Sequence, residues 1–145
     1  MRFIHLTDPH LMPPGRLLYG IDPAERLRAA VSDIDTRVND AAFVIITGDL
    51  VHRADPAAYG LLRQVLGDLT IPVHLGIGNH DDRAAFRSAF PDTPADSDGF
   101  VQFAFTQSGF GFAMLDTVDA GEPSGFLCAN RLAWLRDTLR SFGDT

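Results

Sequence analysis

The segment AFVIITGD, residues 42–49, is a short run rich in valine and isoleucine that leads directly into a glycine and an aspartate. A run of this length, bounded by turn residues, is typical of a buried strand of a parallel sheet. On either side of it, from Pro23 to about Val38 and from Asp55 to about Leu69, apolar residues recur every three or four positions. That spacing is typical of amphipathic helices. The segment is therefore predicted to be the middle strand of a strand–helix–strand–helix–strand unit.

Two further strands complete this unit, at Arg2 to Thr7 and at Val73 to Ile77. The alternating order predicts right-handed crossovers and a mostly parallel sheet. With 46% hydrophobic and 21% charged residues among 145, the composition is that of a folded domain. The fold class is therefore α/β.

The C-terminal third of the chain carries different signals. A short helix is expected from Asp82 to Phe90, where Pro91 stops it. Apolar and small residues alternate around Gln107-Ser108-Gly109, which predicts a β-hairpin whose phenylalanines pack in the core or lie on the hairpin surface. A last helix is expected over residues 130–141, with an inward stripe of Leu132, Leu135 and Leu139.

Composition excludes several classes of function. The formal net charge is −7 and no basic run interrupts it, so neither a general nucleic-acid surface nor an anionic membrane is an expected partner. The single cysteine, Cys128, allows no intramolecular disulfide. The apolar run at the N-terminus is too short for the core of a signal peptide. No stretch of about 18 apolar residues occurs, so no membrane-spanning helix is expected. A cytoplasmic protein is expected.

Three polar clusters follow the three predicted parallel strands: Asp8-Pro9-His10, Gly48-Asp49 and Gly78-Asn79-His80-Asp81. The carboxyl ends of such strands converge on one crevice, where ligands bind. Carboxylate, imidazole and amide oxygen together suit divalent Mn, Fe, Co or Zn. Because a carboxylate has two oxygens, Asp49 on the middle strand is the natural ligand to bridge two cations.

In their order along the chain, these clusters resemble the first three motifs of the calcineurin-like metallophosphoesterases. The flanking segments resemble the branch of class III cyclic-nucleotide phosphodiesterases and glycerophosphodiesterases; they are Leu18-Tyr19-Gly20, Asp81-Asp82-Arg83, Leu115-Asp116-Thr117 and Trp134-Leu135. The resemblance extends from Phe3 to about Leu139. It implies the N-terminal half of a four-layer α/β/β/α sandwich, with a mostly parallel sheet followed by the hairpin and the last helix.

The resemblance also implies roles for individual residues. Asp8 and His10 would bind the first metal, Asp49 would bridge the two, and Asn79 would bind the second. His80 would lie beside the scissile phosphate, so that His80 and Asp49 form the catalytic pair. The cofactors would be two divalent ions (Fe, Mn, Zn or Co), and the reaction would be attack of a metal-bridging hydroxide on a small-molecule phosphodiester, of the cyclic-nucleotide or glycerophosphodiester type.

The sequence also departs from the family pattern. The later histidine pair and the Gly-His-x-His motif of relatives are absent, so residues 1–145 are expected to be a partial metallophosphoesterase domain. On that mapping the second metal keeps only Asp49 and Asn79. The alternative is therefore a truncated or degenerate, inactive domain that binds at most one metal weakly. A nuclease is disfavoured by the lack of basic clusters, and a homo-oligomer of the full-length form stays open.

The remaining histidines are predicted to have structural or solvent-exposed positions. His5 and His74 lie in the middle of predicted strands, so each is expected to be a hydrogen-bonded core or helix-facing residue. His52 and Arg53 replace the residues that relatives more often carry. Either could contact the substrate, but by default both are interpreted as solvated loop residues.

Overall fold

The computed structural model describes residues 1–143, which form four helices and five strands. In chain order the elements are β1 (Ile4–Leu6), α1 (Pro23–Arg37), β2 (Val44–Thr47), α2 (Pro56–Leu66), β3 (Val73–Gly76), α3 (Arg83–Ala89), β4 (Phe103–Gln107), β5 (Phe110–Met114) and α4 (Ala129–Ser141). All the predicted elements are present, most of them shorter by one or two residues at an end.

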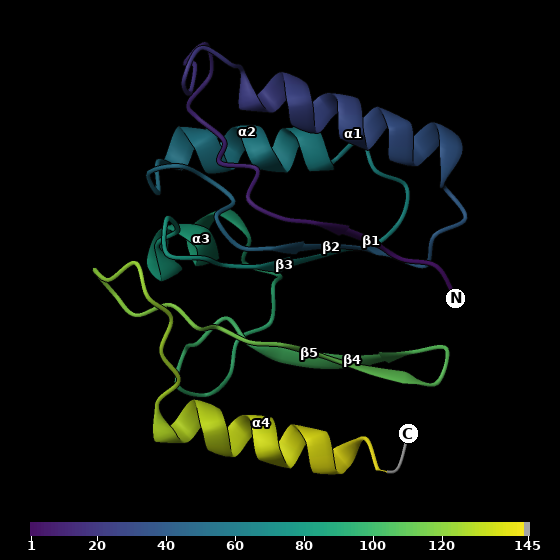
Figure 1. The fold of residues 1–145 in the computed structure, drawn as a ribbon, viewed down its shortest axis with the longest axis vertical. Coiled ribbons are helices and arrows are strands. Elements are labelled where there is room, and N and C mark those ends of the chain that lie inside the picture. Colours follow the sequence, from purple (N-terminus) through teal and green to yellow (C-terminus); the bar gives the residue numbers. More distant parts are fainter. Residues whose placement is uncertain (144–145) are drawn as a thin grey trace.

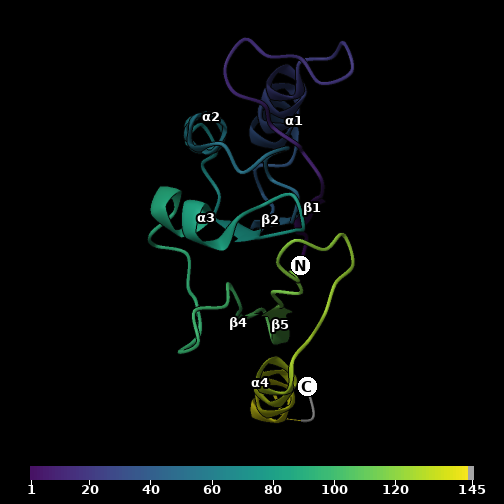
Figure 2. The same ribbon diagram turned by 90° about the vertical axis from the view of Figure 1, so that its left-hand side faces the viewer.

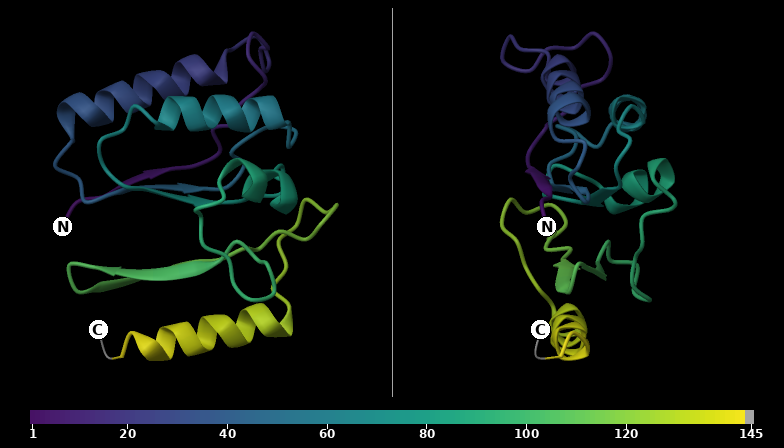
Figure 3. Two further views of the ribbon diagram at one scale, coloured as in Figure 1. Left: turned by 180° about the vertical axis from the view of Figure 1, so that it is seen from behind. Right: turned by 90° about the vertical axis from the view of Figure 1, so that its right-hand side faces the viewer.

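The elements stack as four layers. Helices α1 and α2 cover one face of the β1–β2–β3 sheet, the β4–β5 hairpin lies under the other face, and α4 lies under the hairpin (Figure 1). The end-on views in Figure 2 and in the right panel of Figure 3 show the same sequence of layers. This arrangement confirms the predicted α/β/β/α order.

The three-stranded sheet is parallel throughout, with β2 in the centre. In its register Ile45 of β2 lies between His5 of β1 and His74 of β3. Strand β2 is buried over Val44 to Ile46, whereas β1 at the edge is only partly covered. The predicted crossover order is therefore confirmed, and all three strands end at the same edge of the sheet.

Helices α1 and α2 begin in the same way. Asp22 and Asp55 cap them by accepting hydrogen bonds from the backbone N–H of Ala24 and Ala57, and a proline occupies the first helical turn of each. Such capping satisfies N–H groups that the first turn leaves unpaired. The apolar stripes of both helices then pack on the sheet in the main core, which includes Leu27, Val31, Ile34, Tyr59, Leu62 and Val65.

The hairpin closes a second core on the other face of the sheet. Phe103 and Met114 of the hairpin pack against Phe43 and Ile45 of the sheet. Its turn is two residues long, and both have positive φ, as this type of hairpin turn requires. Phe103 packs in this core and Phe110, which is 62% exposed, lies on the hairpin surface; these are the two kinds of position predicted for the phenylalanines.

The inward stripe predicted for α4 is wrong for two of its three leucines, because only Leu135 is partly buried. Leu132 and Leu139 are exposed, at 49% and 53%, and the buried residue of this helix is Arg131. The Arg131 guanidinium donates hydrogen bonds to the backbone oxygens of Asp116 and Val118, at 2.7 and 3.2 Å. A polar anchor, rather than the leucine stripe, therefore fixes the rotation of α4.

The two strand histidines also differ from their predicted surroundings. His5 is exposed, and its Nε2 lies 2.7 Å from the Thr47 hydroxyl, so it is hydrogen-bonded but outside the core. His74 is half-buried and stacks on Phe105 with ring centroids 4.0 Å apart. Its partial burial lowers the pKa of the His74 imidazole below the usual value. Within residues 1–143 no helix is both long enough and apolar enough to cross a membrane.

Candidate metal centre

The loops that follow β1 and β2 run side by side and carry three of the predicted ligands. The backbone N–H of His10 donates to the carbonyl of Asp49 at 2.9 Å, and that of Asp8 donates to the carbonyl of Gly48 at 3.3 Å. Asp8, His10 and Asp49 all have positive φ, of 54°, 45° and 48°. Left-handed backbone is costly for residues other than glycine and tends to gather at functional sites. Three of the six non-glycine residues with positive φ in the described chain therefore lie where the sequence predicts chemistry.

The loop after β3 meets the loop after β2 at two glycines. A Cβ atom on Gly48 would lie 3.0 Å from the Gly78 backbone, and one on Gly78 would overlap the Asp49 carboxylate. The close approach allows the His80 N–H to donate to Asp49 Oδ1 at 3.1 Å. The Asp49 carboxylate is thereby fixed between the second and third polar clusters.

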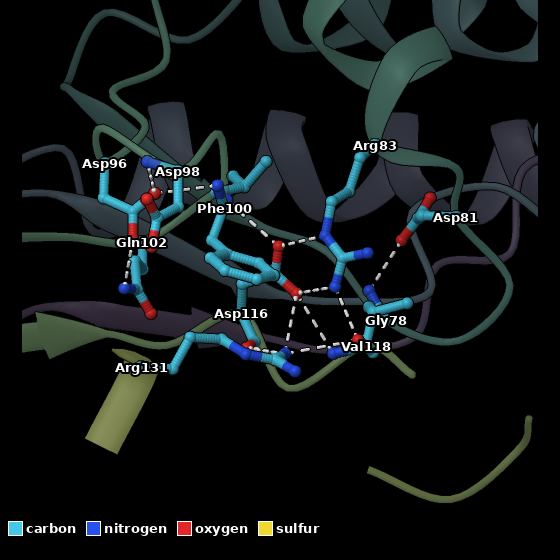
Figure 4. Close-up of polar contacts among 11 residues, drawn as sticks. Gly78, Asp81, Arg83, Asp96, Asp98, Phe100, Gln102, Asp116, Val118 and Arg131 are labelled. Carbon is cyan, nitrogen blue, oxygen red and sulfur yellow. Dashed lines mark hydrogen bonds and ion pairs between the residues drawn. The ribbon is translucent and has the colours of Figure 1, made fainter. Parts of the chain in front are cut away.

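Asp81 connects the same two loops through hydrogen bonds. Its buried carboxylate accepts hydrogen bonds from the N–H groups of Leu50, Val51 and Gly78, at 3.1, 3.3 and 2.9 Å. The Tyr59 hydroxyl on α2 donates a fourth, at 3.0 Å. Figure 4 shows the bond to Gly78. Asp81 is therefore a residue that positions the loops of Asp49 and His80.

The distances between ligand atoms fit a bound cation. His10 Nε2 lies 3.6 Å from Asp49 Oδ2 and 3.9 Å from Asp8 Oδ1, and the ligand atoms of all three residues lie within 4.8 Å of one another. Four atoms about 2.1 Å from a tetrahedral ion are roughly 3.4 Å apart, so a small inward movement gives coordination. Asp8, His10 and Asp49 therefore form a group that could hold a divalent metal ion.

Asn79 is exposed and lies between Gly78 and His80 in the third loop. Its neighbour His80 contacts Asp49 through the backbone, which places the residue at the edge of the same site. Its role as a ligand of a second cation stays a prediction.

His80 lies beside the predicted ligands, with its ring centroid 4.7 Å from that of His10. Its Nδ1 lies 2.9 Å from the carbonyl oxygen of His52. A carbonyl can only accept, so Nδ1 carries the hydrogen and Nε2 is the nitrogen left for a ligand or a substrate.

His52 is the residue that sequence reasoning missed. Rather than lying in a solvated loop, its ring is half-buried, stacks on that of His80 at 5.0 Å, and lies 5.6 Å from that of His10. Desolvation, followed by the neighbouring His80 and His10, lowers the pKa of the His52 imidazole. The available sequence signal was its position, three residues after Asp49.

Two cavities open near these loops and the sheet. One of about 400 Å³ borders Asp8 and His10 and is otherwise mostly apolar, with Arg26 and Tyr19 in its wall. The larger, of about 660 Å³, lies where β3 begins, between His74 and the hairpin, and none of the clustered ligands lines it. The smaller cavity is therefore the one relevant to the candidate metal centre.

Comparison with known proteins gives one family. The model of the calcineurin-like phosphoesterases matches residues 1–145. A "probable cyclic nucleotide phosphodiesterase" of Rhodopseudomonas palustris is 47% identical over 141 residues, which are 96% of this chain and 52% of that protein. A glycerophosphodiester phosphodiesterase of Enterobacter lignolyticus is 32% identical over 149 residues, 99% of this chain and 53% of its own. The chain thus spans about half the length of the curated relatives it matches.

A third relative, a cAMP/cGMP dual-specificity phosphodiesterase of Mycobacterium tuberculosis, is 31% identical over 141 residues, 94% of this chain and 44% of that protein. Among solved structures, a purple acid phosphatase from yellow lupin superimposes with a TM-score of 0.65 at 14% identity. The match covers 97% of this chain and 27% of the phosphatase chain. At that identity the likeness concerns the fold alone.

Proposed function

The chain belongs to the calcineurin-like phosphoesterase family, and from this premise we propose that it serves the metal-dependent hydrolysis of small-molecule phosphodiesters. The observation that carries the proposal is the meeting of Asp8, His10 and Asp49, whose ligand atoms lie within 4.8 Å of one another at the carboxyl edge of the sheet. In this proposal residues 1–145 form the part of a metallophosphoesterase domain that holds Asp8, His10, Asp49 and Asn79.

The residues that would hold the metals are those of the three loops. Asp8 and His10 would bind the first ion, Asp49 would bind both, and Asn79 would bind the second; the ions would be two of Mn, Fe, Zn or Co. When bound, such ions neutralise phosphate charge and lower the pKa of a coordinated water. They also supply the positive charge that a chain of net charge −7 lacks for binding a phosphodiester.

The protein's own groups fix the geometry for this reaction. The carbonyl of His52 keeps the hydrogen of His80 on Nδ1, so the Nε2 of His80 faces outward from that bond. In the protonated ring, Nε2 donates a hydrogen bond to a phosphate oxygen or to the departing alkoxide. A donor preorganised in this way typically contributes about 100-fold or more to the rate.

The substrate class follows from the relatives and from charge. Their names refer to cyclic nucleotides and glycerophosphodiesters, which are small phosphodiesters. The cavity of about 400 Å³ beside Asp8 and His10 has the size of a small-ligand pocket, so it would receive one ester group. The acidic net charge argues against a nucleic-acid polymer as substrate.

The test is hydrolysis of bis(p-nitrophenyl) phosphate and of 3′,5′-cyclic AMP with Mn²⁺ present, comparing the wild-type protein with its Asp49→Ala variant. Wild-type activity that Asp49→Ala abolishes supports the proposal. Asp33→Ala is the matched control, because Asp33 is an exposed carboxylate on α1 that pairs with Arg37 and belongs to neither group of candidate metal ligands. Activity retained by Asp49→Ala would end the assignment of Asp49 as the bridging ligand.

A second candidate is a domain that binds one cation without catalysis. It is favoured by one observation: within residues 1–143, the two groups of three metal-binding side chains share His10 and so describe a single centre. Metal bound per chain separates the candidates. Two equivalents of Mn²⁺ with hydrolysis support the enzyme, and one equivalent without hydrolysis supports the single-cation domain.

A further inference from the structure

Three imidazoles from three different loops meet beside the candidate metal centre. The ring centroids of His10 and His80 are 4.7 Å apart, those of His52 and His80 5.0 Å, and those of His10 and His52 5.6 Å. One ring nitrogen of each lies within 4.8 Å of one ring nitrogen of each of the others. All three residues are half-buried, so solvent competes little for these nitrogens.

Backbone hydrogen bonds hold the three rings in place. His52 N–H donates to the Leu11 carbonyl at 3.0 Å, His10 N–H to the Asp49 carbonyl at 2.9 Å, and His80 N–H to the Asp49 carboxylate at 3.1 Å. The loops carrying the rings are thus bonded to one another, which restricts the movement of the rings. A cluster preorganised in this way loses less entropy when it binds an ion.

The polar atoms of the cluster are not satisfied by the protein. Nδ1 of His10 and Nδ1 of His52 are buried without a hydrogen-bond partner among the described residues. His80 uses its Nδ1 hydrogen for the carbonyl of His52, which leaves the lone pair on Nε2. A buried polar atom without a partner is costly, and a bound cation would remove that cost.

We propose that His10, His52 and His80 bind a divalent transition-metal ion such as Zn²⁺ or Ni²⁺ through three imidazole nitrogens. Imidazole favours these ions, whereas carboxylate, amide and water ligands suit Mn²⁺. Three nitrogens leave a fourth position open for water or an anion, as in catalytic zinc sites. His10 belongs to both sets of ligands, so the imidazole set forms a nitrogen-rich side of the centre next to Asp8 and Asp49. Because this ion takes the Nε2 lone pair of His80, it binds in place of the hydrogen-bond donor role that His80 has in the proposed hydrolysis.

The key variant is His52→Phe, which keeps an aromatic ring against His80 and removes both nitrogens. The dissociation constants of Zn²⁺ and Ni²⁺ are measured by competition with a chromophoric chelator, and that of Mn²⁺ by electron paramagnetic resonance. We expect His52→Phe to weaken the binding of Zn²⁺ and Ni²⁺ by roughly 10- to 100-fold. This is at least the loss of affinity seen when a supporting group of a metal site is removed. The Mn²⁺ affinity should stay unchanged.

His5→Phe is the matched control, because His5 is an exposed histidine bonded to Thr47 and belongs to neither group of candidate metal ligands. His52→Gln is a second variant, and circular dichroism confirms that each protein is folded. Equal Zn²⁺ affinities for wild type and both folded His52 variants would overturn the proposal.

A spectroscopic readout identifies the ligands without any activity. On addition of Zn²⁺, the ring ¹⁵N resonances of His10, His52 and His80 should move, while those of His5 and His74 stay. Movement of the His10 resonances alone would refute the three-imidazole site. Asp49→Asn separates this site from the proposed hydrolysis. The variant should lose hydrolysis, and Zn²⁺ should still shift the ring ¹⁵N resonances of all three histidines. If the His52 and His80 resonances of this variant did not shift, the result would also count against the proposal.

Discussion

Arg83 and Asp116 form a two-pronged ion pair, in which the guanidinium Nε and Nη2 lie 2.6 and 2.8 Å from the two carboxylate oxygens. Asp116 is wholly buried and also accepts hydrogen bonds from the N–H groups of Val101 and Val118, both at 3.0 Å. Figure 4 shows Arg83 on one side of this carboxylate and Arg131 on the other. The pair therefore connects α3, which follows the His80 loop, to the segments before and after the hairpin.

Replacement of Asp116 by asparagine should destabilise the protein strongly. The change keeps the shape but leaves the partly buried Arg83 and the buried Arg131 without their negative partner. Breaking a buried ion pair from one side costs about 3 kcal/mol or more, so the free energy of unfolding in urea should fall by about that amount. Asp33→Asn is the control, since it loses only an exposed pair with Arg37, worth about 0.5 kcal/mol. Equal losses for the two variants would contradict the role of Asp116.

Much of the fold was predictable because the spacing of apolar residues and the capping residues at the helix starts indicated the same elements. The apolar run at residues 42–49 and the helical stripes on either side fixed the parallel unit, and Asp22 and Asp55 marked the helix starts. The face of α4 was not predictable from its leucines. A buried Arg131 held by two carbonyls overrode the apolar pattern, and such long-range polar partners leave no periodic trace in the sequence.

Tyr59 should make the protein sensitive to alkaline pH. Burial, followed by the neighbouring Asp81 carboxylate, raises the pKa of the Tyr59 hydroxyl far above its usual value. The unfolded chain releases this proton at about pH 10, while the folded chain keeps it. The free energy of unfolding should therefore fall by about 1.4 kcal/mol per pH unit above pH 10 on account of this residue.

The measurement is urea unfolding between pH 9 and pH 11 for the wild type and Tyr59→Phe. The chain contains no lysine, so few other groups titrate in this window. At pH 9 the variant should be less stable by about 1 to 2 kcal/mol, because Asp81 loses a donor. That difference should shrink as pH rises above 10. If the free energies of unfolding of the two proteins changed in parallel with pH, the pKa of Tyr59 would not be the cause of the pH dependence.

The part of the candidate site that lies in the three polar clusters was predictable from the sequence. Asp8, His10, Asp49 and His80 were found because each follows a strand, and parallel strands end at one edge. His52 was missed because it lies three residues beyond Asp49, after the chain has turned, and the bonds of its N–H to Leu11 and of its carbonyl to His80 place it in the site. The sequence gives residue types for such a loop but not its path.

The hairpin turn offers a stabilising change. Ser108 has φ of 51° and is followed by Gly109 at 83°, the backbone of a turn in which both residues favour asparagine or glycine. Ser108→Asn should raise the free energy of unfolding by about 0.5 kcal/mol, measured in urea. Ser88→Asn, the same change inside helix α3, should give no gain. A gain from both variants would show that the turn conformation is not the cause.

The last prediction concerns the contact between Gly78 and Asp49. A methyl group at Gly78 would overlap the Asp49 carboxylate oxygen and its backbone nitrogen. Backbone atoms cannot move aside as a flexible side chain can, so Gly78→Ala should displace Asp49 from its ligand position. We expect Mn²⁺ affinity to weaken about 10- to 100-fold, the range for disturbed support of a metal ligand.

Gly60→Ala is the matched control for Gly78→Ala, because Gly60 lies inside α2 with open space around its Cβ position. Alanine there should leave Mn²⁺ affinity unchanged and raise stability by about 0.5 to 1 kcal/mol, the difference in helix propensity. Both variants are measured by Mn²⁺ titration and by urea unfolding. If Gly78→Ala bound Mn²⁺ as tightly as Gly60→Ala, the position of Asp49 would not depend on the close approach of the two loops, and the geometry of the centre would need another explanation.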